Sequence, residues 1–549
     1  MHERKSFMEI ESIVIPATND FASLYMEQKE PVKGFFHYDI TENEVYKNRY
    51  NDLMKQNFNR KALAACIENY MERFPTSEET RKSLEKLQNE QSTVVIGGQQ
   101  AGLLTGPLYT IHKVISILKL AEQQERNLGT PVIPVFWIAG EDHDFLEINH
   151  VYTEVGNKMK KVNFPEQKGL KQMASDIVYD KEEMQKWLET IFMHLGERKY
   201  TKEVFASVLE ASNRSETITD FFTTLIMTLF KDYGLLVIDA ADPHLRELEK
   251  PVFAKVMEQA SLITEKVLNQ QELLADNGFN RMIEIHQQSA NLFLYEGKER
   301  LLLDYDSQLD RFKVEKSDWQ MDRQDLCKKL QETPELFSNN VVTRPLMQEF
   351  LFPSLAFIAG PGEIAYWGEL KQAFELWDMK MPPLIPRINI TFIESNIERD
   401  VHDLQLTIEN VLKNGVEKPK KVYLDSVTDQ HLETMLDDIN QYMEERYQSI
   451  FERLDDTERG LLPLAQKNLT FHTKQIEFLK KKADWFVQER YKSEVAKYER
   501  VERSLRPNGS PQERIWNIFY YLNERGDQFI HQLMSLPFEF DGKHKIIKI

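Results

Sequence analysis

Residues 93–113 read TVVIGGQQAGLLTGPLYTIHK, and this stretch decides the fold. The β-branched run 93–96 ends in two glycines, which predicts a buried strand that leads into a turn. A helix is expected from Pro107, and the apolar run PVIPVFWIA at 131–139 predicts a second buried strand. Strand, helix and strand in succession form a βαβ unit, so we expect a parallel sheet here.

The same strand signal recurs at 234–239, 355–359 and 383–387, with intervening segments that read as insertions. This pattern predicts an α/β fold with a doubly wound parallel sheet, whose strands come from distant parts of the chain. The predicted division is N-terminal helices and the first part of the core over 1–149, an insertion over 150–233, core over 234–269, a second insertion over 270–340, core over 341–424, a helical hairpin over 425–503, and a C-terminal helix and tail over 504–549.

The composition changes near Thr428, where apolar residues begin to recur every three or four positions. Two long helices joined by a turn at Gly460 form an αα-hairpin, and this spacing is typical of a coiled coil. Two ordinary surface helices packed on a core are the alternative, but many Glu, Lys and Arg residues on the other faces favour the coiled coil. We expect the seam to bury against a second copy, giving a homodimer. The seam residues are Leu432, Leu436, Ile439, Met443, Tyr447, Ile450, Leu469, Ile476, Leu479, Ala483 and Phe486.

The composition excludes several classes of protein. The 549 residues carry a net charge of −19, so nucleic acid and anionic membrane surfaces are not expected as partners. The two cysteines, Cys66 and Cys327, form neither a disulfide framework nor a zinc-binding pattern. There is no signal-peptide pattern and no apolar run long enough to cross a membrane. We therefore expect a cytoplasmic protein.

The turn after the first strand is the first candidate site. Its glycines, Gly98, Gly102 and Gly106, permit close backbone approach, and the start of the following helix would attract a carboxylate or phosphate. The alternative is a tight turn that needs glycine only for packing. His112 and Lys113 lie further along that helix, where a lone histidine is more often structural.

Acidic residues crowd the end of the second strand, in Trp137–Asp144. Such a cluster can shift pKa values, so it indicates a general base or a site for a substrate ammonium group. A Mg²⁺ or Mn²⁺ site from Asp142, Asp144 and His150 is a weaker alternative, and helix capping by one of the acids is another.

Two further segments carry candidate ligands. Gly360–Trp367 forms another strand–turn–helix junction, and Arg344 and Arg387 could hold a carboxylate in a bidentate way, or could form ion pairs within the fold. Near the C-terminus, Arg506–Arg514 fits a helix start, and its two arginines could also hold a phosphate.

Four motifs in this order resemble those of the BshC family, the cysteine-adding enzymes of bacillithiol biosynthesis: GGQQAGLLTGPLYTIHK at 97–113, VFWIAGEDHDF at 135–145, RPLMQEFLFPSLAFIAGPGEIAYW at 344–367, and LRPNGSPQERIWNIFYYLNERG at 505–526. The resemblance covers the chain from about residue 10 to its end. It implies a Rossmann-like core with two connecting-peptide insertions and a coiled-coil domain that mediates dimerisation.

The resemblance also implies a reaction, the addition of L-cysteine to glucosaminyl-malate to form an amide. Amide formation from a free carboxylate needs activation, so ATP or another nucleotide is expected, with Mg²⁺ accompanying it and no tightly bound metal. The chain has neither a HIGH-type tetrapeptide nor a KMSKS loop, the signatures of related nucleotidyl transferases. A nucleotidyl transferase acting on another small acid, or a dimeric scaffold with a vestigial site, remain the rival functions.

We map the family's site onto three groups of residues, from this resemblance and the motifs above. The catalytic group is Gln99, Gln100, His112, Lys113, Asp142 and His143. The substrate-binding group is Gly98, Gly102, Thr105, Gly106, Trp137, Glu141, Asp144, Ser338, Asn340, Arg344, Gly360, Gly362, Glu363, Tyr366 and Arg387. The nucleotide-binding group is Arg506, Asn508 and Arg514.

Overall fold

A computed structural model describes residues 8–165 and 172–549. The chain divides into two compact units, one ending at Phe392 and completed by Gln512–Ile549, the other spanning Ile393–Pro511. The second unit thus begins well before the predicted hairpin boundary at 425. Helices α16 (Ser395–Asp403) and α17 (Ile408–Asn414) pack on α21 (Lys492–Leu505), and Arg500 binds Asp400 across the first of these contacts, with Nη2 2.8 Å from a carboxylate oxygen.

The first unit is built on a five-stranded parallel sheet with the order β13-β12-β2-β3-β6. The chain enters at the centre, on β2, and builds outward in both directions, which confirms the predicted doubly wound sheet. Its strands are β2 (Thr93–Gln99), β3 (Val132–Ile138), β6 (Leu236–Asp239), β12 (Ser354–Ala359) and β13 (Leu384–Pro386). The strand order reverses between β2 and β12, and ligands of such folds bind beyond the carboxyl ends of the strands at that point.

Helix α5 (Leu108–Leu128) connects β2 to β3 and packs on β2, β3 and β12. Pro107 caps this helix with extended backbone rather than occupying its first turn. The residues before it form a strained turn, since Leu104 and Thr105 both have positive φ angles, of 50° and 67°. Helices α2 (Val45–Leu53), α3 (Arg60–Met71) and α4 (Glu78–Leu87) also pack against strands of the sheet.

Two groups of elements interrupt the core. The first begins with the antiparallel hairpin of β4 (His150–Val155) and β5 (Lys158–Asn163) and continues in α7 (Lys181–Leu195), α8 (Thr201–Arg214) and α9 (Ile218–Phe230). The second contains a five-stranded antiparallel sheet with the order β10-β9-β8-β7-β11. Its strands are β7 (Ser289–Glu296), β8 (Glu299–Asp306), β9 (Arg311–Val314), β10 (Gln320–Asp322) and β11 (Phe337–Asn339).

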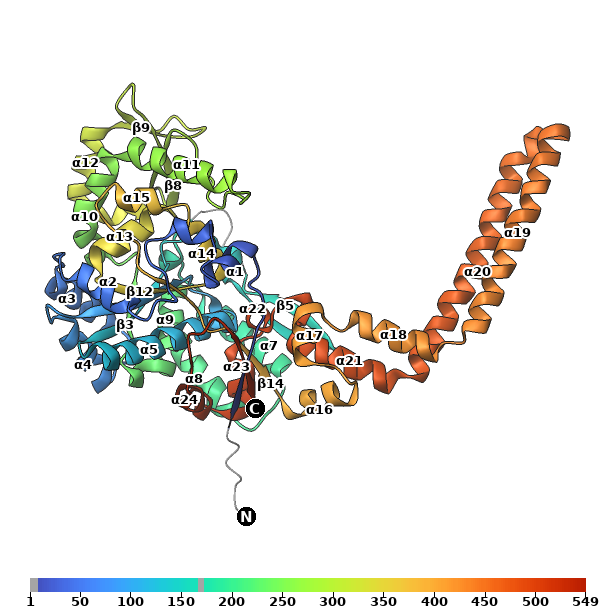
Figure 1. The fold of residues 1–549 in the computed structure, drawn as a ribbon. Coiled ribbons are helices and arrows are strands. Elements are labelled where there is room, and N and C mark those ends of the chain that lie inside the picture. The colour runs from blue at the N-terminus through green and yellow to red at the C-terminus, as the bar shows by residue number, and fades with distance from the viewer. Residues whose placement is uncertain (1–7, 166–171) are drawn as a thin grey trace, which may run out of the picture. The chain divides into compact units, whose positions relative to one another are not determined.

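The second unit contains the predicted αα-hairpin. Helices α19 (Gln430–Thr457) and α20 (Leu462–Arg490) lie side by side and antiparallel (Figure 1). In this part of the described chain Leu436 is the only buried residue of the two helices, and large apolar side chains of both stay exposed. The two helices therefore bury little of their apolar surface within the second unit. Among the described residues, no helix is long and apolar enough to span a membrane.

Candidate functional site

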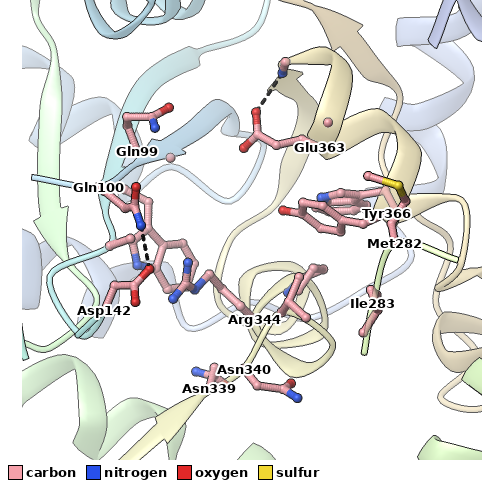
Figure 2. A pocket seen from close by; sticks show the side chains of 18 of the residues that line it. Gln99, Gln100, Asp142, Met282, Ile283, Asn339, Asn340, Arg344, Glu363 and Tyr366 are labelled. Carbon is pink, nitrogen blue, oxygen red and sulfur yellow. Dashed lines mark hydrogen bonds between the residues drawn. The ribbon is translucent and has the colours of Figure 1, made fainter. Parts of the chain in front are cut away.

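A cavity of about 670 Å³ lies in the first unit where the strand order reverses. Its walls come from the ends of β2, β3 and β12, from α13 (Thr343–Leu351) and α14 (Pro361–Trp367), and from the antiparallel sheet (Figure 2). More than half of the predicted site residues line it: Gly98, Gln99, Gln100, Trp137, Asp142, His143, Asn340, Arg344, Gly360, Gly362, Glu363, Tyr366, Arg387 and Arg514.

The glycine-rich turn contributes to the cavity only through its first part. Gly102, Thr105 and Gly106 do not line it. A Cβ on Gly102 would lie 2.8 Å from Cα of Gly106, and Asn517 Nδ2 donates to the backbone oxygens of Leu104 and Gly106, both at 2.7 Å. The later glycines thus permit close packing of a turn held by Asn517, which is the alternative reading of this segment.

Lys113 and His112 are both buried in α5, beneath the cavity wall. Lys113 Nζ donates to the backbone oxygen of Gly98 at 2.7 Å and to Glu363 Oε2 at 2.6 Å. The same carboxylate oxygen accepts from the backbone N–H of Gly360 at 2.7 Å (Figure 2). Lys113 therefore positions the ends of β2 and β12 and does not itself line the cavity. His112 Nδ1 lies 3.3 Å from Glu513 Oε2 and is likewise outside the lining.

Asp142 is the carboxylate that the end of β3 presents to the cavity. Gln100 Nε2 donates to its Oδ2 at 2.8 Å (Figure 2). Burial raises the pKa of Asp142. The charge of Arg344, the hydrogen bond from Gln100 and the charge of Arg300 lower it by more, so the pKa lies below its usual value. The group is therefore an anion at neutral pH, suited to bind a cation.

Glu141, its neighbour, is fully buried and outside the cavity lining. Its carboxylate pairs with Arg246 and with Arg344, whose Nη2 lies 2.8 Å away, and Arg246 also pairs with the buried Glu249. Burial opposes ionisation of Glu141, but the two guanidinium groups outweigh it and lower its pKa. The prediction that Glu141 receives a substrate amine does not fit this position, because its oxygens are already occupied by arginines of the fold.

Two other predicted residues also lie outside the cavity. Asp144 is exposed and does not line it, and Ser338 is buried, where its Oγ accepts from Arg300 Nε at 3.0 Å. Among residues 8–165 and 172–549, no group of three His, Cys, Asp or Glu side chains is placed to hold a metal ion. The alternative metal set that contained Asp142 and Asp144 is therefore not assembled.

Arg300, on β8, is a cavity residue that the sequence analysis missed. Its Cζ lies 3.8 Å from the ring centroid of Phe293, and its Nη1 lies 3.9 Å from Asp142 Oδ1 and 3.4 Å from His143 Nδ1. Burial lowers its pKa to about 10, so it stays charged. No sequence motif marks Arg300, which is the second residue of β8 and follows the hairpin turn at 297–298.

Several polar side chains in the wall lack hydrogen-bond partners, although they are buried. Among the described residues they include Asn339, with both amide atoms unpartnered, and Gln348 and Trp137, each with its side-chain nitrogen unpartnered. Buried polar groups are nearly always hydrogen-bonded, so unpartnered ones beside a cavity indicate partners that a ligand supplies. Asn340 is different, because its Oδ1 accepts from the backbone N–H groups of Val342 and Thr343 at the start of α13.

The three predicted nucleotide-binding residues belong to different compact units. Arg514, on α22 (Gln512–Ile515), lines the cavity of the first unit. Arg506 and Asn508 belong to the second unit, where Arg506 donates to the backbone oxygens of Lys413 and Gly509, at 3.2 and 3.0 Å. Asn508 adopts a left-handed conformation, with φ of 52°, in a short 3₁₀ turn.

Comparison with known proteins covers the whole chain. Residues 8–388 match the family model of the bacillithiol biosynthesis BshC N-terminal Rossmann-like domain, and residues 390–549 match its C-terminal coiled-coil domain. A protein of Geobacillus sp. (strain WCH70) is 41% identical over 542 residues, and one of Bacillus cereus (strain AH187) is 39% identical over 542 residues; each alignment spans 99% of this chain and 100% of the relative. Both relatives are named "Putative cysteine ligase BshC". The chain therefore belongs to the BshC family of bacillithiol biosynthesis.

Proposed function

We propose that this chain is a ligase that joins L-cysteine to the amine of glucosaminyl-malate through an amide bond. The observation that carries the proposal is one cavity whose wall presents an ionised carboxylate, Asp142, together with guanidinium groups of Arg344 and Arg387. A substrate that carries both an amine and carboxylates needs complementary charges of both signs. We infer the cysteine substrate and the ligase reaction from the names of the relatives.

Asp142 is the residue that we assign to the substrate amine. It is held by Gln100 and lines the cavity, whereas Glu141 beside it is buried and paired. In the reaction a C–N bond forms between the cysteine carboxyl carbon and the sugar nitrogen, a carboxyl C–O bond breaks, and the amine loses a proton. His143 lies next to Asp142 in the wall, and its imidazole ring would accept that proton.

The sugar portion is assigned to the wall formed by Asn339, Gln348 and Trp137. Their unpartnered groups are mostly N–H donors, which match the hydroxyl oxygens of a sugar. Phe293 and Tyr366 supply aromatic surface in the same cavity. A polar, hydroxylated ligand would restore the hydrogen bonds that these buried groups lack.

Activation of a carboxylate in water requires an energy source, and we propose ATP or another nucleotide, accompanied by Mg²⁺. It would convert the carboxyl oxygen into a leaving group. The donor set fits a phosphate chain chemically, because the guanidinium group of Arg344 lines the cavity and a Cβ on Gly362 would meet no atom within 4 Å, so that backbone is open to approach. These residues would bind and orient the anion.

We propose that the coiled coil forms a homodimer. Four large apolar residues of α20 follow one another at intervals of seven and are exposed: Leu464 (64%), Phe471 (56%), Phe478 (56%) and Trp485 (48%). A repeat of seven keeps side chains on one face of a helix that supercoils with a partner. We call these four residues the α20 stripe, and a second copy would cover it. The free thiols of Cys66 and Cys327 fit the cytoplasmic location that we propose.

The central experiment supplies purified protein with cysteine, glucosaminyl-malate and Mg-ATP and follows the condensed product by mass spectrometry. We expect an amide product, and its loss in Asp142→Asn. Asp144→Asn is the matched control, because this substitution removes the same charge two residues away, at a position outside the cavity lining. Absence of product from the unmodified protein, or equal loss in both variants, would contradict the proposal.

A further inference from the structure

Arg514 differs from the other basic residues in and beneath the cavity wall. Its side chain is exposed and lines the cavity, and no acidic group of the described residues lies within ion-pair distance of it. It is placed by α22, directly after Glu513, a buried residue that anchors this segment through Arg387 and His112. A guanidinium held at a cavity wall without a carboxylate is available for an anionic ligand.

Carboxylates of the fold already partner the other cationic side chains. Arg387 Nη2 lies 2.5 Å from Glu513 Oε1, Arg344 is bound to Glu141, and Lys113 is bound to Glu363. Arg300 faces Asp142 at 3.9 Å. Among the described residues that line the cavity, Arg514 is thus the one whose guanidinium charge is not compensated by a carboxylate at close range.

Tyr109 lines the cavity with Arg514 and Arg387. All three residues line the cavity, and Arg387 Cζ lies 5.5 Å from the ring centroid of Tyr109. Both arginines favour the phenolate electrostatically, while burial, Glu147 and Glu363 oppose it, and burial dominates, so the pKa of Tyr109 is raised. The phenol is therefore neutral and keeps its proton as a hydrogen-bond donor.

We propose that Arg514, Arg387 and Tyr109 form the subsite that receives the carboxylates of the acceptor substrate, and so make the enzyme selective for a glycoside with an anionic tail. This inference rests on the proposed function and adds the element that recognises the malyl group. Two guanidinium forks and a phenol donor match two carboxylates. A nucleotide's phosphate chain carries more negative charge than the positive charge of this subsite can balance, because Glu513 already neutralises Arg387.

Direct titration calorimetry on the full chain tests the subsite without requiring turnover. For Arg514→Gln we expect glucosaminyl-malate to bind about 10- to 100-fold more weakly, as is typical for the loss of a hydrogen bond between charged groups. Methyl glucosaminide, which lacks the carboxylates, should bind both proteins equally. Arg514→Lys should recover part of the loss. Arg126→Gln is the matched control, since Arg126 is 68% exposed and lies outside the cavity, and it should bind like the parent.

The outcomes separate the subsite from the proposed function. Equal binding of glucosaminyl-malate by the parent and by Arg514→Gln would overturn the subsite. A variant that binds ATP more weakly but binds glucosaminyl-malate like the parent would also overturn it. If the parent binds glucosaminyl-malate and the variant does not, yet neither forms an amide, the subsite stands and the ligase proposal fails. If the parent binds no glucosaminyl-malate but binds malate in an Arg514-dependent manner, the carboxylate subsite again stands, while the assigned substrate is wrong.

Discussion

Lys113 and Glu363 join the two strands between which the sheet reverses its order. The Lys113 ammonium, buried in α5, lies 2.6 Å from the Glu363 carboxylate on α14 and 2.7 Å from the backbone oxygen of Gly98 at the end of β2. Burial lowers the pKa of Lys113, and Glu363 opposes that shift. The pair therefore holds the ends of β2 and β12 together at the cavity wall, which Glu363 lines and Lys113 does not.

Replacement of Lys113 by Met should destabilise the protein by about 3–5 kcal/mol, because removal of one partner leaves a carboxylate in a partly buried site without its counter-charge. The double variant Lys113→Met/Glu363→Gln should regain part of that loss. Denaturant unfolding of the parent, both single variants and the double variant gives the coupling energy. A coupling energy near zero would mean that the pair does not hold the two strand ends together.

Replacement of Asn339 should increase the stability of the protein and weaken its binding of the sugar substrate. Both of its amide atoms are buried without partners in the described structure, so Asn339→Leu should raise the free energy of unfolding by about 1–3 kcal/mol. The same change should raise KM for the sugar substrate and leave KM for cysteine unchanged. Thermal melts and initial rates measure the two effects. A variant that loses stability while keeping its KM would assign Asn339 to the fold alone.

The predictable parts of this protein are those in which local sequence determines structure. The β-branched run at 93–96 and the apolar run at 131–139 form strands because each is apolar throughout and is bounded by turn residues. The site was less predictable. Glu141 and Asp142 are adjacent acids, and which one faces the ligand depends on Arg246, a partner 105 residues along the chain from Glu141. Neither residue type nor spacing carries that information.

Arg514 and Asn339 also could not be assigned correctly from residue type and spacing alone. Arg514 was grouped with Arg506 because the two are neighbours in sequence, although a boundary between compact units separates them. Asn339 lies between Ser338 and Asn340, two predicted substrate-binding residues, at the end of the short strand β11. Only their tertiary partners distinguish the three residues. Ser338 binds Arg300, Asn340 caps a helix, and Asn339 is left for the cavity.

Glu513 should make the stability of the protein depend on pH in the acid range. Burial opposes its ionisation, but Arg387 and His112 lower its pKa from 4.5 to about 2. A depressed pKa means that the stabilisation is complete above pH 4.5 and is lost as the pH falls toward 2, and it amounts to about 3 kcal/mol. Glu513→Gln should therefore be less stable at pH 7, with a difference that shrinks below pH 4.5. Denaturant unfolding across this range measures it, and a difference independent of pH would contradict the assignment.

The α20 stripe gives the most direct test of the oligomeric state. Phe471 and Phe478 are each 56% exposed in the single chain, so their replacement by Glu removes little packing within the hairpin. If a second copy covers the stripe, Phe471→Glu/Phe478→Glu should shift the mass in solution from dimer to monomer, because two charges would be buried on each side of the interface without partners.

Sedimentation or light scattering across micromolar concentrations measures this shift. Glu477→Lys is the control, since it changes charge at an exposed position of the same helix that is outside the stripe, and it should leave the dimer intact. A thermal melt of the first unit should be unchanged in the double variant. If the parent is a monomer at every concentration, the stripe has another partner and the homodimer proposal is wrong. If the parent is a dimer that resists the double change, the contact lies elsewhere on the chain, and the hydrophobic residues of α19 become the next candidates.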